Sequence, residues 1–181
     1  GNFTKRIHLP NLNKVGDNVS VGAIVCRKGS GALELAKEYG AVYASTSIDD
    51  VLNDSEINAV LIGTRHNLHA ELTLKALKAG KHVFVEKPLA ISENELRKIE
   101  QFFKENNVSK KNNLPVLLTG FNRRFSPFMS QIKETVKNRK FPLVMNYQMN
   151  AGYLSPDHWL RTEEGGGRNI GEACHIYDLF T

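Results

Sequence analysis

Apolar runs alternate with amphipathic stretches along most of the chain. β-favouring residues follow one another in short blocks that predict strands at 19–26, 42–44, 59–62, 83–85 and 116–119. Apolar residues at helical spacing predict helices at 5–14, 32–39, 49–52, 69–78 and 92–103. Gly40 is a helix stop, and Ser92 and Glu95 have the spacing of a capping box. Because strands alternate with helices, we expect an α/β fold with a doubly wound parallel sheet of the Rossmann type.

The pattern changes toward the C-terminus. A stretch rich in Lys and Asn at 104–113 is expected to be a surface loop. After Gly120, the pattern predicts helices at 128–136 and 170–180, a half-exposed strand at 143–149 and an irregular stretch at 151–167. We therefore place a domain boundary at Asn122. Residues 1–122 are expected to form the doubly wound domain and residues 123–181 the beginning of an α+β domain.

Composition is that of a soluble globular protein and excludes several functions. Of the 181 residues, 41% are hydrophobic and 24% charged, and no apolar run approaches the ~20 residues that span a bilayer. We expect no membrane partner and no secretory signal. Cys26 and Cys174 lie far apart, which favours reduced thiols in a cytoplasmic protein and argues against a metal site. The formal charge of +5 comes from scattered basic residues without a nucleic-acid-binding motif, so we expect no nucleic-acid partner.

The strand at 83–85 runs into a Glu-Lys-Pro sequence. Pro88 lacks the N–H that a strand ladder needs, so Lys87 lies where the strand stops. In open parallel sheets this carboxyl edge is where ligands bind. Lys87 is therefore a candidate catalytic residue. The alternative, that Glu86 and Lys87 are solvated charges at a strand end, is open for this motif taken alone.

Several stretches, in their order and spacing, carry a family resemblance. They are Gly1-Asn2-Phe3, Ile62-Gly63-Thr64 with His69-Ala70, Glu86-Lys87-Pro88, Gly120-Phe121-Asn122-Arg123-Arg124-Phe125, and Gly165-Gly166-Gly167 leading to His175 and Asp178. Together they resemble the Gfo/Idh/MocA oxidoreductases, the relatives of glucose-fructose oxidoreductase and inositol dehydrogenase. The resemblance implies an NAD(P)-binding Rossmann domain followed by a substrate domain whose sheet is often used to form homo-oligomers.

The reaction that this resemblance implies is hydride transfer between a nicotinamide and a hydroxyl carbon of a sugar, cyclitol or related alcohol. Lys87 would position the hydroxyl and the nicotinamide ribose, and His175 would exchange the hydroxyl proton. Two alternatives stay open at this point. One is a hydrolase of the same fold in which tightly held NAD assists glycoside cleavage, and the other is a non-catalytic nucleotide-binding homologue.

The resemblance also assigns residues to the cofactor. Gly1, Asn2 and Phe3 would end the glycine-rich phosphate turn, so the first strand would lie upstream, and without it two strand edges would be unpaired. Cys26 and Arg27 follow the strand at 19–26, where NAD-selective relatives carry an acidic residue. Arg27 favours NADP over NAD, with an exposed basic loop as the alternative. The other predicted cofactor contacts are Thr64, Arg65, His66, His69, Glu86, Lys87 and Asn122.

Proton transfer and substrate binding are assigned to the C-terminal helix and the segment before it. Glu172, His175 and Asp178 recur every three residues and so share one helical face. Many relatives carry an aspartate four residues before this histidine, where the chain has Gly171, so Glu172 is predicted to orient the imidazole. The alternative for His175 is a histidine satisfied inside a domain interface. The predicted substrate contacts are Lys87, Arg123, Trp159, His175 and Asp178, with a mobile loop at 165–167.

Overall fold

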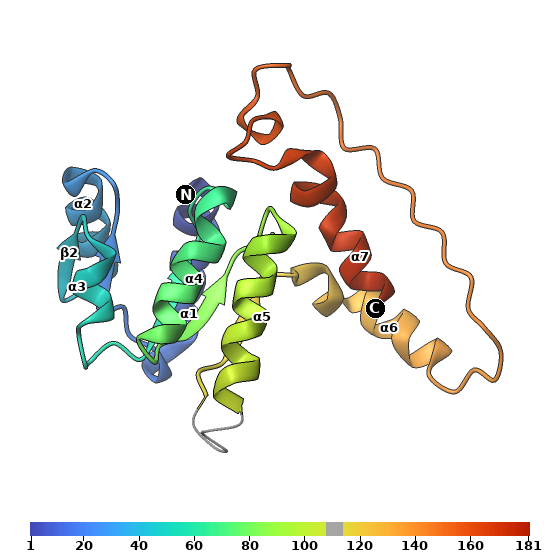
Figure 1. The fold of residues 1–181 in the computed structure, drawn as a ribbon, viewed down its shortest axis with the longest axis horizontal. Coiled ribbons are helices and arrows are strands. Elements are labelled where there is room, and N and C mark those ends of the chain that lie inside the picture. Colours follow the sequence, from blue (N-terminus) through green and yellow to red (C-terminus); the bar gives the residue numbers. More distant parts are fainter. Residues whose placement is uncertain (108–113) are drawn as a thin grey trace.

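Short parallel strands form two separate sheets in the computed structural model, which describes residues 1–107 and 114–181. In one sheet, β1 (Ala23–Val25) pairs with β2 (Tyr43–Ser45). In the other, β4 (His82–Val85) lies between β3 (Ala59–Ile62) and β5 (Leu117–Thr119). Figure 1 shows the part of the chain that contains β2 standing apart from the part that contains α4 and α5. The predicted parallel α/β fold is confirmed.

Helices follow the strands along the chain. At the N-terminus, the π-helical turn η1 (Thr4–His8) runs directly into α1 (Leu9–Lys14), and a short 3₁₀ turn, η2 (Gly16–Asn18), follows. The helices after β1 to β4 are, in order, α2 (Gly29–Tyr39), α3 (Ile48–Leu52), α4 (His69–Lys78) and α5 (Glu93–Asn107). The 3₁₀ turn η3 (His66–Leu68) joins β3 to α4.

Local sequence signals account for two of the helix ends. α2 ends at Gly40, whose φ of +67° is a left-handed conformation that glycine adopts without a Cβ clash. α5 begins with the predicted capping box. The Glu95 carboxylate accepts the N–H groups of Ile91 and Ser92, and the Ser92 hydroxyl accepts the N–H of Glu95. This cap starts α5 a few residues after the turn that carries Lys87.

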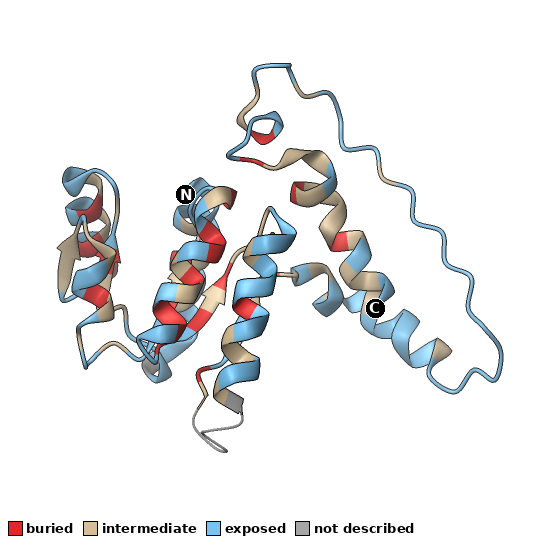
Figure 2. Cartoon of the chain, in the orientation of Figure 1, coloured by how far each residue is buried: buried red, intermediate tan, exposed pale blue. Residues whose placement is uncertain are grey.

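Two apolar clusters hold the strands and their helices together. The larger cluster joins β3, β4, α4 and α5, and Val85 (0% exposed) and Leu77 (1% exposed) are its largest fully buried apolar side chains. The smaller cluster joins α1, β1 and α2 through Leu9, Ile24 and Ala36. Figure 2 shows buried residues gathered on these elements. Close packing therefore holds the carboxyl ends of β3 and β4 in place.

The chain beyond β5 has little core of its own. The turn η4 (Asn122–Phe125) leads into α6 (Pro127–Val136), and an extended stretch then runs back to the turn η5 (Trp159–Arg161), as Figure 1 shows. The π-helical turn η6 (Asn169–Ala173) continues into α7 (Cys174–Phe180). Among the described residues beyond 122, Leu160 is the only large apolar side chain that is buried.

The expected unpaired edges are confirmed, whereas three local predictions are wrong. Among the described residues, β1 and β3 each pair with a strand on one side only. The strand predicted at 19–26 contracts to β1, because only those three residues enter a parallel ladder. The strand predicted at 143–149 is extended but has no partner strand within the described ranges. Residues 104–107 belong to α5 rather than to a loop, and 108–113 lie outside the described residues.

No helix in the described part of the chain has the length and apolarity needed to cross a membrane.

Candidate active site

Lys87 links the edge of the larger sheet to the C-terminal helical segment. The N–H of Glu86 donates to the carbonyl of Ile62, which continues the β3–β4 contact to the residue before Lys87 (2.8 Å). The next peptide bond, Lys87–Pro88, is cis. The Lys87 Nζ donates to the carbonyl oxygen of Gly171 at 2.7 Å, across 84 residues of sequence. The lysine that the sequence places at a strand end therefore points at η6, one turn before His175.

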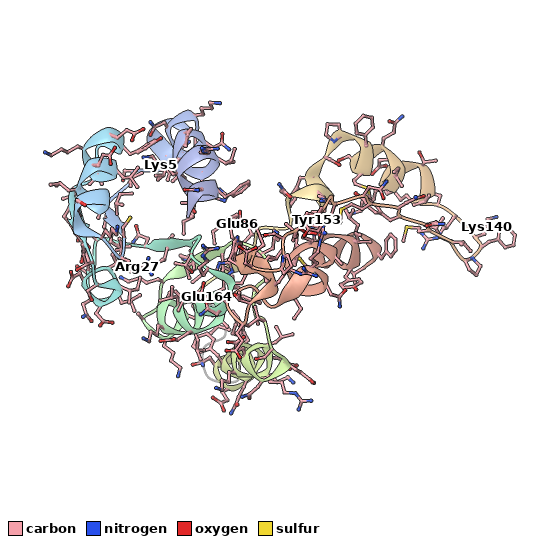
Figure 3. The ribbon with its side chains drawn as sticks, turned by 90° about the horizontal axis from the view of Figure 1, so that it is seen from above. Lys5, Arg27, Glu86, Lys140, Tyr153 and Glu164 are labelled. Carbon is pink, nitrogen blue, oxygen red and sulfur yellow. The ribbon has the colours of Figure 1, made fainter. Side chains whose placement is uncertain are left out.

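The Glu86 carboxylate beside this lysine is half-buried, and both of its oxygens have hydrogen-bond partners. Its Oε1 lies 2.6 Å from the Nε2 of His8, and its Oε2 accepts the backbone N–H of Lys87 at 3.2 Å. Burial acts to raise the pKa of Glu86, but the His8 contact and the Lys87 N–H and charge outweigh it, so the pKa lies below its ordinary value. Figure 3 labels Glu86 near the middle of the molecule. Glu86 is therefore held in place by its neighbours, and its contact with the cofactor stays a prediction.

His175 is buried, but one of its ring nitrogens lacks a hydrogen-bond partner among the described residues. The residue is only 8% exposed, and its Nδ1 has no hydrogen-bond partner among the described residues. The ring of Phe121 stands edge-on at 6.1 Å between centroids. Burial lowers the pKa of His175, and the positive charges of Lys87 and Arg123 lower it further. At neutral pH the imidazole is therefore in its neutral form, which is the form that a general base requires.

The two carboxylates predicted to share a face with His175 are bound elsewhere. Glu172 accepts the Nε–H of Arg168 at 2.8 Å, and the predicted hydrogen bond to His175 is not formed among the described residues. Asp178 accepts a bidentate contact from Arg124. For Glu172, the π-helical turn η6, with its i→i+5 hydrogen bonds, alters the three-residue spacing to His175 that was assumed from the sequence. Asp178 lies in α7 together with His175, and its contact with Arg124 does not depend on η6.

Gly171 occupies the place where the family resemblance leads one to expect an aspartate, and its surroundings are crowded. A Cβ on Gly171 would lie 2.6 Å from the Leu160 Cδ1 and 3.1 Å from the His66 Cε1. A side chain at this position would have to displace the tip of the Leu160 side chain. The Gly171 carbonyl accepts a hydrogen bond from the Lys87 ammonium.

The residues assigned to the phosphate turn lie against the end of β3. Gly1 donates from its backbone nitrogen to the carbonyl of Gly63 at 2.7 Å, and the Thr4 hydroxyl approaches the same oxygen. A Cβ on Gly63 would overlap the Thr4 side chain, so only glycine permits this approach. The start of η1 and the end of β3 therefore lie against each other.

The turn after β3 is covered by the segment around Trp159. The guanidinium carbon of Arg65 lies 4.1 Å from the Trp159 ring centroid, and the Arg65 Nε lies 3.8 Å from the Glu164 carboxylate. The His66 Nδ1 is 2.8 Å from the carbonyl of Gly165, and burial lowers the pKa of His66. Trp159, predicted as a substrate wall, here packs on Arg65 and His66.

The triple glycine allows this covering segment to fold tightly. Gly166 and Gly167 adopt φ values of +70° and +82°, which other residues reach only with strain. A Cβ on Gly165 would overlap the backbone of Leu160. The predicted loop at 165–167 is therefore a compact turn packed on the chain, with Gly165 bound to His66.

His69 belongs to the core rather than to an open cofactor surface. It is 1% exposed, and its Nδ1 lies 2.7 Å from the carbonyl of Pro88 while its Nε2 lies 3.3 Å from that of Thr64. Burial lowers the pKa of His69, although these backbone contacts and Glu86 oppose the shift. His69 thus connects the residue after Lys87 to α4, and its predicted contact with the cofactor stays a prediction.

The remaining predicted residues are Cys26, Arg27, Asn122 and Arg123. Cys26 donates its N–H to Ser45 at 3.1 Å, and Arg27, labelled in Figure 3, follows it with an exposed side chain. Asn122 is exposed in η4. Arg123 donates from Nη1 to the Tyr147 hydroxyl at 3.0 Å.

Sequence reasoning missed two residues at this site, His8 and Arg168. His8 contacts Glu86 from the helix that follows Gly1, and Arg168, directly after the triple glycine, holds Glu172. The signal for His8 was its position two turns into the helix that begins at the phosphate turn. No sequence spacing pointed to Arg168.

Comparisons with known proteins show which family the chain belongs to. The family model described as "Oxidoreductase family, NAD-binding Rossmann fold" (Gfo/Idh/MocA) matches residues 1–112. The curated myo-inositol 2-dehydrogenase of Thermotoga maritima is 33% identical over 175 residues, covering 96% of this chain and 49% of the relative. The chain spans about half the length of the curated relatives it matches.

Solved structures show the same likeness. The crystal structure of a probable dehydrogenase from Thermotoga maritima matches with a TM-score of 0.63 and 32% identity over 73% of this chain and 37% of the other. A levoglucosan dehydrogenase in complex with NADH and levoglucosan matches with a TM-score of 0.56 and 28% identity over 65% of this chain and 30% of the other. Because the family model covers more than half of the chain, this protein belongs to the Gfo/Idh/MocA oxidoreductase family, with its NAD-binding Rossmann fold.

Proposed function

We propose that this chain carries the cofactor-binding and proton-transfer residues of an NAD(P)-dependent oxidoreductase. Its reaction is hydride transfer between a nicotinamide and a hydroxyl carbon of a sugar, cyclitol or related alcohol. The observation that carries the proposal is the 2.7 Å contact from Lys87 Nζ to Gly171, which brings the lysine beside a buried His175 with an unpaired Nδ1. The named substrates of relatives, myo-inositol and levoglucosan, support this class of alcohol.

The residues present fit a nicotinamide dinucleotide. Gly63 approaches Thr4 closely, so the backbone at Gly1 lies at the carboxyl end of β3. In Rossmann folds the pyrophosphate of the cofactor binds at this edge of the sheet. The open N–H groups at the start of a helix suit an anion. Lys87, on the adjacent strand, lies at the same edge. The cofactor supplies the hydride acceptor when it is bound.

The chain's own residues then handle the hydroxyl proton. The Lys87 ammonium donates a hydrogen bond to the substrate oxygen and stabilises negative charge that develops there. His175, kept neutral by burial and by the cations of Lys87 and Arg123, accepts the hydroxyl proton. The edge-on ring of Phe121 and the burial of His175 keep water away from that imidazole.

The decisive experiment replaces Lys87 by methionine, which keeps an unbranched side chain without the charge. We expect kcat to fall about a thousandfold, while the cofactor Kd changes less than about twofold. Lys78→Met, at the exposed end of α4, is the matched control and keeps full turnover. Failure of the unaltered chain to bind either cofactor contradicts the proposal. Product formation without net cofactor reduction identifies the hydrolase instead, and cofactor binding without turnover of any alcohol identifies the binding homologue.

The cofactor itself is proposed to be NADP rather than NAD. Arg27 stands exposed after β1, and no carboxylate occupies that stretch of sequence to accept the ribose hydroxyl of NAD. Titration of the chain with both cofactors tests the choice. Arg27→Gln is expected to weaken NADP about tenfold, or ~1.4 kcal/mol, and to leave NAD unchanged. A tenfold preference of the unaltered chain for NAD refutes it.

We further propose that the boundary at Asn122 separates two domains and that the second forms a homo-oligomer, in a cytoplasmic protein. Support comes from exposed apolar side chains after the boundary, of which Phe141 is 80% and Val144 94% exposed. The cytoplasmic assignment is supported by free thiols at Cys26 and Cys174. Light scattering gives the mass in solution, and a monomer at high concentration contradicts the oligomer.

A further inference from the structure

A histidine near the start of the chain reaches the turn that carries Lys87. The Nε2 of His8 lies 2.6 Å from the Glu86 carboxylate, and the two side chains are only 16% and 14% exposed. The rings of Phe3 and Phe84 stand edge-on to the imidazole, with centroids at 5.3 and 5.2 Å. Aromatic contacts from both its own helix and β4 therefore hold the His8 ring in one orientation.

Glu86 connects His8 to the backbone of Lys87. One carboxylate oxygen receives His8 and the other accepts the Lys87 N–H at 3.2 Å. Because the carboxylate is ionised, the His8 Nε2 carries the proton and donates it. Gly120 leaves room for this group, since a Cβ there would lie 3.1–3.3 Å from the Glu86 carboxylate atoms.

The position of the lysine ammonium depends on this backbone. The Lys87 side chain extends from the peptide that Glu86 holds to the carbonyl of Gly171 at 2.7 Å. His69 holds the opposite side of the same turn through the carbonyl of Pro88. If the His8 contact is lost, Glu86 becomes a half-buried carboxylate with one unpaired oxygen, and the turn gains freedom to move.

We propose that His8 is a positioning residue: through Glu86 it fixes the backbone of Lys87 and couples the helix after the phosphate turn to the catalytic lysine. The proposal rests on the role of Lys87 given above. Because η1 begins at the residues that are proposed to bind the cofactor, cofactor binding would also fix the position of the Lys87 side chain. A displacement of about 1 Å in a catalytic group lowers turnover as much as a hundredfold, so a small backbone shift is sufficient.

Hydrogen exchange of the Lys87 amide tests the contact without any need for turnover. In the full chain, His8→Ala is expected to speed exchange of this amide at least about tenfold relative to the Val85 amide. His8→Gln keeps a donor toward Glu86 and restores much of the protection, and it also serves if the alanine variant does not fold. His82→Gln, a histidine at the other end of β4, is the matched control and leaves exchange unchanged. Equal exchange in the His8 variants and the control overturns the proposal.

Kinetics separate positioning from a general structural role. Both His8→Ala and Glu86→Gln are expected to lower kcat about tenfold with the substrate KM within about twofold, and the double variant to be no slower than either single variant. Additive losses, or losses confined to KM, overturn the proposal. A chain that binds no cofactor disproves the proposed function, while the exchange experiment still decides the role of His8.

Discussion

The regions before and after Asn122 are held together by different forces. Before it, apolar side chains of strands and helices pack into two cores. After it, apolar side chains are largely exposed, as for Phe128 (78%) and Val144 (94%), and the contacts to the first region are mainly backbone and polar. The main ones are Lys87 with Gly171, His66 with Gly165, and Asn67 with Glu164. Among the described residues, buried apolar packing is therefore concentrated before Asn122.

The candidate site therefore lies where the closely packed region before Asn122 meets the region after it. Lys87 comes from the packed sheet and His175 from the segment beyond it. Each hydrogen bond between the regions contributes about 0.5–1.5 kcal/mol, much less than a buried apolar side chain in the core. We therefore expect the arrangement of Lys87 and His175 to be easier to disturb than the fold that carries the lysine.

The largest expected effect comes from opening the core. Leu77→Ala removes a side chain that is 1% exposed and is expected to lower the free energy of unfolding by about 3 kcal/mol. Val144→Ala, in the second region, is expected to change it by less than about 0.5 kcal/mol. Urea unfolding followed by circular dichroism measures both. Similar losses in the two variants would show that the second region has a core of its own.

A smaller effect is expected from loosening the contact between the regions. Gly165→Ala introduces a Cβ that overlaps the Leu160 backbone and is expected to cost about 1–3 kcal/mol. The sequence contains one tryptophan, Trp159, which packs on His66, so its emission is expected to shift to longer wavelength as the segment detaches. Gly31→Ala, in α2 with open space around its Cβ, is the control and keeps the native emission. An unchanged emission in Gly165→Ala contradicts the close packing of this turn.

Acid is expected to have the mildest effect and to act on the contact first. The pKa values of His66, His69 and His175 lie below the ordinary 6.5, chiefly because of burial. The unfolded chain therefore binds protons before the folded one. The stability that these neutral histidines provide is fully present above pH 6.5 and is lost as the pH falls toward their folded pKa values. For each histidine, the free energy of unfolding decreases by less than about 1.4 kcal/mol per pH unit.

Because His66 and His175 lie where the regions meet, Trp159 emission is expected to change at a higher pH than circular dichroism. A titration from pH 7.5 to 5 that records both signals on one sample makes the comparison. Coincident transitions would show that the two regions unfold together. His82→Gln, which alters an exposed part of β4, is expected to leave the order of the transitions unchanged.

The sequence predicted local structure well wherever one short-range signal was sufficient. The Gly40 stop and the Ser92–Glu95 cap act within one turn, and both are confirmed. The strand at 143–149 failed because an alternating pattern needs a partner strand, and the described chain offers it none. The spacing of Glu172 with His175 failed because a π-helical turn changed the period, which no propensity of the residues announced.

By itself, the sequence determined the α/β alternation, the lysine at the end of a strand and the family. Each of these follows from apolar period and from motifs that are contiguous in the chain. Only the tertiary structure decided what the lysine touches. It brought Gly171 to Lys87 across 84 residues and His8 to Glu86 across 78, and it bound Glu172 to Arg168. These pairings depend on how packed elements approach one another, and the pattern along the chain does not encode that approach in any single stretch.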